Sequence, residues 1–186
     1  MKKCKRQAGR NCKQAGFTLI EMLIVIIILG ILAMVIIPQI TVSTEDAKVS
    51  TLKTNLTGVR GTIEVYYAQH NMTYPGVKTD GTNAAGTALA FVSQLTQYTD
   101  VNGVVSGTKT ATHIYGPYIK GNVLPANPFV DDTAKNNQVS VDNTITNVTT
   151  ARAVIAGGNG WAYWPQVGIF FANDDGATNG INHETY

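Results

Sequence analysis

The residues FTLIEMLIVIIILGILAMVII, from Phe17 to Ile37, form the most apolar run in this chain of 186 residues and set its architecture. As an α-helix, these 21 residues extend about 32 Å, close to the thickness of the hydrocarbon core of a bilayer. We therefore expect residues 17–38 to form a transmembrane helix. The run contains a single charged residue, Glu21.

The chain before this run is a basic leader. Residues 1–16 hold six of the 14 lysines and arginines and no acidic residue, whereas residues 17–186 carry a net charge of about −4 from eight basic and 12 acidic residues. Positive flanks favour the cytoplasm, so we expect the rest of the chain to face outward. Its negative charge argues against a nucleic-acid partner. Both cysteines, Cys4 and Cys12, lie in the leader, and the remaining chain has neither a disulfide nor a Cys-type zinc site.

Gly16 and Glu21 distinguish this segment from an ordinary signal or anchor. A secretory signal is cut after its apolar stretch, whereas here the small residue Gly16 stands before it. An acid at the centre of a membrane helix costs about 2.5–3.5 kcal/mol and by default marks a partner. Glu21 lies near one end, where snorkelling lowers that cost, but nothing obvious within the helix compensates it. If the chain is cut between Gly16 and Phe17, the new amino group of a neighbouring subunit can neutralise Glu21. This pairing favours helix-on-helix assembly.

The residues AGFTLIE, from Ala15 to Glu21, resemble the class III signal of type IV pilins and type II secretion pseudopilins. In that family a prepilin peptidase cuts after the glycine and N-methylates the following phenylalanine. The resemblance implies cleavage between Gly16 and Phe17, methylation of Phe17, and a role for Glu21 as the assembly acid.

The resemblance extends to Gly30 and Pro38, where the family helix unwinds in the filament. Proline removes a backbone donor and glycine favours other conformations, so both residues permit helix flexibility. The alternative is an ordinary kink of a membrane helix.

Beyond the membrane segment, residues 39–72 show the period of an amphipathic helix. Apolar residues recur at spacings of three and four on one face: Val49, Leu52, Leu56, Val59, Ile63 and Tyr66. We expect the helix to run to about Asn71, because Tyr74-Pro75-Gly76 is a strong stop signal. His70 continues the stripe, and we expect it to be a surface or half-buried residue.

Residues 73–186 read as a globular head. We expect a short helix near Ala88–Tyr98 and strands at Gln138–Thr146, Ala151–Ala156 and Trp161–Asn173, with a hairpin turn at Gly157–Gly160. The expected fold is therefore α+β and pilin-like: a long N-terminal helix packed on a small antiparallel sheet. Five aromatic residues are expected to fill the core between them: Trp161, Tyr163, Trp164, Phe170 and Phe171.

The head is similar to the major pseudopilins of type II secretion in several segments. They are Ile63–Pro75, Gly116-Pro-Tyr-Ile-Lys120 and Leu124–Phe129, and the final strand Gly160–Asp174 resembles that group's closing hairpin loosely. The Asn/Thr-rich insert Lys135–Thr150 departs from that pattern.

In secretion pseudopilins an acidic loop of the head commonly holds calcium. Asp131-Asp132 and Asp174-Asp175 offer oxygen ligands, the second pair being the better one because it follows a strand and precedes a glycine. Neither pair has EF-hand spacing, and solvated turn residues are the alternative. The three histidines His70, His113 and His183 form no metal signature, so we expect no metal site and no cofactor, with calcium kept open.

No nucleophile–base pair or cofactor motif stands out, and a structural role is expected rather than an enzymatic one. The resemblance implies a homo-oligomeric filament subunit of the inner membrane, with a periplasmic head. Its partners are then the prepilin peptidase, the assembly platform and the minor pseudopilins. The Gly116–Phe129 segment favours a type II secretion pseudopilus. The alternatives are a type IV pilus subunit for adhesion, motility or DNA uptake, and a stand-alone membrane-anchored binding module.

Overall fold

The computed structural model describes residues 17–178 and 180–186, and of residues 35–43 the backbone alone. The expected leader and the position of Gly16 lie outside the described residues. The chain forms two compact units that divide after Ser43.

Helix α1 runs from Leu19 to Gln69 and its helical backbone continues through Gly30 and Pro38. The helix ends two residues earlier than expected, because Asn71 and Met72 adopt left-handed backbone angles, with φ of 53° and 55°. No helix of the described residues is both long enough and apolar enough to cross a membrane. The expected span ends at Pro38, and the side chains of residues 35–38 lie outside the described part.

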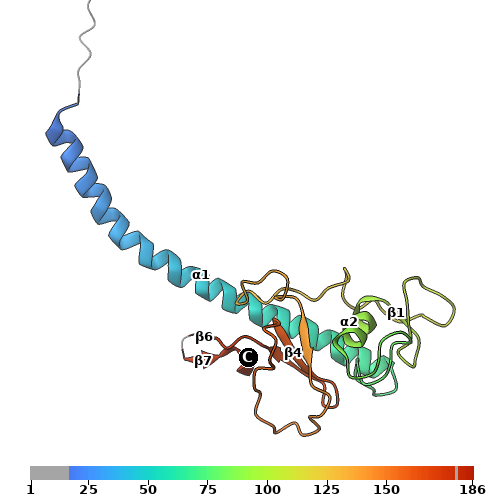
Figure 1. Ribbon diagram of the computed structural model, residues 1–186. Helices are drawn as coiled ribbons and strands as arrows, with labels where there is room; N and C mark the ends of the chain where they lie inside the picture. The colour runs from blue at the N-terminus through green and yellow to red at the C-terminus, as the bar shows by residue number, and fades with distance from the viewer. Residues whose placement is uncertain (1–16, 179) are drawn as a thin grey trace, which may run out of the picture. The chain divides into compact units, whose positions relative to one another are not determined.

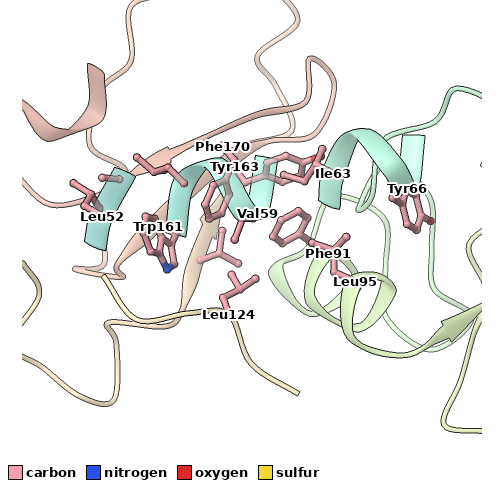
Figure 2. Packing of buried hydrophobic residues seen from close by; sticks show 13 residues of the cluster. Leu52, Val59, Ile63, Tyr66, Phe91, Leu95, Leu124, Trp161, Tyr163 and Phe170 are labelled. Atoms are coloured by element: carbon pink, nitrogen blue, oxygen red, sulfur yellow. The ribbon is translucent and has the colours of Figure 1, made fainter. Parts of the chain in front are cut away.

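The head is built on the second half of α1. The expected stripe is confirmed: five of its side chains are at most 2% exposed, namely Leu52, Leu56, Val59, Ile63 and Tyr66. Helix α2, Ala88–Thr96, is capped at its N-terminus by Thr87 and contributes Phe91 and Leu95 to the same core. Figure 2 shows Val59 of α1 and Phe91 of α2 close to Tyr163 of the sheet.

The central sheet has three strands, β3 (Val139–Val141), β4 (Trp161–Trp164) and β5 (Ile169–Ala172), in that order (Figure 1). β4 and β5 form the antiparallel hairpin, with Ala162 opposite Phe171. β3 runs parallel to β4, so the sheet is mixed rather than wholly antiparallel.

Two details of the expected sheet are wrong. Residues 151–156 form no strand, and Gly157–Gly160 is no hairpin turn. Both lie in the connection from β3 to β4, which must cross over because the two strands are parallel. The hairpin turn lies instead at residues 165–168.

Both faces of β4 and β5 are covered, which explains why all four β4 residues are buried. On one face, Trp161, Tyr163 and Phe170 pack on α1 and α2. On the other face, Trp164 and Phe171 form a second cluster with Ala162. Ile145 and Ile155 from the crossover segment pack against that cluster. The five aromatic residues are therefore core residues, as expected, and the crossover from β3 to β4 supplies the cover of the outer face.

Short elements complete the head. The β1–β2 ladder joins Tyr98–Thr99 to Val105–Ser106, and the β6–β7 ladder joins Ala177–Thr178 to Ile181–Asn182. The 3-10 turn η1, His183–Thr185, follows β7 and lies against β5.

Candidate assembly site at the start of α1

Thr18 and Glu21 form a reciprocal cap on the first turn of α1. The amide and the hydroxyl of Thr18 both donate to Oε2 of Glu21, each over 2.7 Å. The amide of Glu21 donates to Oγ1 of Thr18 over 3.2 Å. This is a capping box, in which the residue before the helix and the third helical residue satisfy one another's free amides.

The cap corrects the expectation that nothing within the helix compensates Glu21. One carboxylate oxygen is held by Thr18, while Oε1 accepts no hydrogen bond in the described part of the chain. The negative charge also lies at the positive end of the helix dipole. The Thr-x-x-Glu spacing in Thr18–Glu21 is the signal by which sequence reasoning could have found this cap.

In the described part of the first unit, residues 17–34 present an exposed and largely apolar surface. Every residue from Phe17 to Met34 is exposed, and the first and last of them, Phe17 and Met34, are each 80% exposed. Contiguous apolar surface of this extent marks an interaction with another protein or with lipid. At Gly30, an added Cβ would meet nothing within 4 Å, so the helix is open there to a close neighbour.

The two aspartate pairs considered as possible calcium ligands do not come together. Asp131 and Asp132 are exposed, and so is Asp175, whereas Asp174 is 9% exposed and is paired with His183. Among the described residues, no three His, Cys, Asp or Glu side chains converge as a possible metal site.

The histidines have separate surroundings. His70 is 1% exposed, so the expectation of a surface or half-buried residue is wrong. Its ring bonds to the Tyr66 carbonyl and to the Thr99 hydroxyl, which explains how it can be buried at the end of the stripe. His113 lies among loop threonines, while His183 is buried in the C-terminal segment.

The head has an open groove between α1 and the loop after the Gly116-Pro117 bond. Its lining is small or apolar for the most part, including Gly58, Val59, Val123 and Leu124, and its one ionisable cation is Lys120. The groove lining contains no His, Cys, Asp or Glu side chain.

Comparison with known proteins assigns the class. Residues 11–37 match the family described as "Prokaryotic N-terminal methylation motif". "Type II secretion system core protein G" of Pseudomonas aeruginosa is 36% identical over 66 residues, which are 36% of this chain and 46% of that protein. A "Fimbrial protein" of Neisseria meningitidis is 36% identical over 115 residues, 61% of this chain and 65% of that protein. The chain is thus of the class that carries a prepilin-type methylation motif.

The match to a third relative covers a larger share of that protein. "Type IV major pilin protein PilE1" of Neisseria gonorrhoeae is 34% identical over 119 residues, 61% of this chain and 68% of that protein. The chain therefore belongs to the type IV pilin and pseudopilin family. It spans about half to two thirds of the length of the first two relatives. No solved structure matches the chain.

Proposed function

We propose that this protein is a structural subunit of a pilus-like filament, polymerised for type II protein secretion. The observation that carries the proposal is the start of α1, where an uncovered apolar helix holds one acid with a free carboxylate oxygen. An apolar helix of this kind is stable when other helices or lipid cover it. Before assembly, α1 anchors the subunit in the inner membrane, with the head in the periplasm.

Assembly in this proposal depends on processing. Removal of residues 1–16 by prepilin peptidase creates a cationic, N-methylated amino terminus at Phe17. The amino group of one subunit then donates to Oε1 of Glu21 in its neighbour, while Thr18 keeps Oε2 in place. The pair attracts more strongly inside an apolar bundle than in water. An assembly ATPase and its platform supply the work, and minor pseudopilins are further partners.

The test is Glu21→Ala in cells with an active prepilin peptidase, with sheared filaments as the readout. We expect the variant to be processed but not assembled. Glu45→Ala is the matched control, because Glu45 is also an exposed acid on α1, and it should assemble normally. Normal filaments from Glu21→Ala contradict the proposal.

Intact mass of membrane-extracted protein tests the processing step separately. Loss of residues 1–16 with one added methyl group supports a filament subunit. A full-length, unmodified chain favours the stand-alone anchored module instead.

A type IV pilus subunit is the second candidate. The match to the Neisseria proteins covers 61% of this chain, whereas the match to the secretion protein covers 36%. The head segment Gly116–Phe129 favours secretion by its resemblance to major pseudopilins. Complementation separates the two: rescue of a strain that lacks its major pseudopilin supports secretion, while rescue of a pilin-deficient strain supports the pilus.

A further inference from the structure

The C-terminal segment of the head has little regular structure to hold it. After β5 ends at Ala172, the chain forms two-residue strands β6 and β7 and the three-residue turn η1. Small structural units of this kind are commonly fixed by disulfides or metal ions. Both cysteines of the chain lie at positions 4 and 12, so a disulfide does not fix this segment.

A buried carboxylate joins three separate parts of the head at this point. Oδ1 of Asp174 is hydrogen-bonded to Nδ1 of His183 and accepts from the amide of Gly176 over 3.1 Å. Oδ2 accepts from Nδ2 of Asn127 over 2.7 Å. Asp174 follows β5, His183 begins η1, and Asn127 belongs to the loop before β3, so one side chain ties together segments far apart in the sequence.

The imidazole of His183 is held on its other sides as well. Nε2 is hydrogen-bonded to Oγ1 of Thr178 over 2.9 Å. The ring packs on Phe129, with centroids 3.9 Å apart, and the Tyr186 ring lies 6.0 Å away on a nearly parallel plane. His183 is 1% exposed and Asn127 is 0% exposed. The arrangement is therefore a closed polar contact within the head.

The groups around the Asp174 side chain stabilise its carboxylate and do not form a binding site for a cation. Calcium takes six to eight oxygen ligands, whereas the groups around Asp174 are nitrogen donors from an imidazole, a side-chain amide and a backbone amide. The neighbouring carboxylate of Asp175 is exposed. We infer that Asp174, His183 and Asn127 form a clasp that fixes the C-terminal segment in the place of a calcium ion or a disulfide, and that the head folds without calcium.

Calcium titration of the full-length protein in detergent tests the inference without any variant. Both tryptophans, Trp161 and Trp164, are buried in the head, so their fluorescence reports its unfolding. A bound ion raises the melting midpoint in proportion to the logarithm of its concentration. We expect equal midpoints in excess EDTA and in millimolar calcium. A midpoint that rises steadily with calcium overturns the inference.

Two matched variants test the clasp itself. Asp174→Asn removes the carboxylate that accepts hydrogen bonds from three donors. We expect the melting midpoint of this variant to fall by on the order of 10 °C. Asp175→Asn changes the adjacent exposed acid, and we expect it to melt as the unmodified protein does. If the loop bound calcium, the melting midpoint of the unmodified protein would rise with calcium, and both variants would lose that rise. An unchanged melting midpoint in Asp174→Asn also overturns the clasp. If Asp174→Asn fails to fold while Asp175→Asn folds normally, the result supports the clasp.

Discussion

The ring of His70 stacks on the ring of Tyr66, one turn earlier in α1, with centroids 3.7 Å apart and planes inclined by 3°. Nδ1 of His70 bonds to the Tyr66 carbonyl over 2.8 Å, and Nε2 bonds to Oγ1 of Thr99 over 2.9 Å. A carbonyl can only accept, so Nδ1 carries the proton and Nε2 of the neutral ring accepts from Thr99. The histidine thus fixes the end of α1 to β1.

This contact predicts a pH dependence of stability. Burial lowers the pKa of His70, and the Tyr66 carbonyl and Asp100 offset that effect in part. In the unfolded chain the pKa is about 6.5, so below that value the unfolded state binds a proton that the folded state resists. The contribution of His70 is therefore fully present above about pH 6.5 and is lost as the pH falls towards the folded pKa.

We expect the free energy of unfolding in guanidinium, followed by tryptophan fluorescence, to fall as the pH is lowered below about 6.5. His70→Gln should lose that part of the dependence. Direct titration of the His70 ring by NMR gives an independent check. A midpoint at or above the ordinary histidine value contradicts the prediction.

Tyr163→Phe should stabilise the head. The hydroxyl of Tyr163 is buried and has no hydrogen-bond partner among the described residues. An unsatisfied buried hydroxyl costs about 1–3 kcal/mol, so its removal should raise the free energy of unfolding by about 1 kcal/mol. Tyr118→Phe is the control, because its hydroxyl donates to Gln69 over 2.7 Å and its loss should lower stability slightly. A loss of stability in Tyr163→Phe would indicate a partner such as a buried water.

Two residues of α2 test the assignment of the core. Phe91 is 0% exposed, and its ring lies 4.1 Å from that of Tyr163, whereas Leu89 on the same helix is 67% exposed. Phe91→Ala should lower the free energy of unfolding by about 3–5 kcal/mol, because it leaves a cavity in the core. Leu89→Ala should change it by about 0.5 kcal/mol or less. Chemical denaturation of both variants measures the difference, and equal losses contradict the assignment.

Periodic features were predictable from the sequence and long-range ones were not. The stripe from Leu52 to Tyr66 follows from a spacing of three and four, because a helix places such residues on one face. The parallel pairing of β3 with β4 has no such signal: β3 has three residues, and the register joins Val139 to Trp161 across a long crossover.

The Thr18–Glu21 cap and the Asp174 clasp also differ in how far the sequence predicts them. The cap of Thr18 and Glu21 is a local contact with a known spacing and could have been predicted. The clasp of Asp174 depends on Asn127, which lies 47 residues away, and on a histidine with no motif around it. A contact set by tertiary packing has no period in the sequence that would show it.

Gly30→Ala tests whether helix flexibility is needed for assembly. Alanine is about 1 kcal/mol more favourable than glycine within a helix, and the added Cβ meets nothing within 4 Å, so the substitution should stiffen α1 without a clash. If the segment between Gly30 and Pro38 unwinds as the filament forms, the variant should assemble more slowly or in lower yield. Gly61→Ala is the matched control, since Gly61 also lies on α1 with open space around it. Filament yield after shearing, normalised to processed subunit, is the measurement. Equal yields for the two variants would show that flexibility at Gly30 is dispensable for assembly.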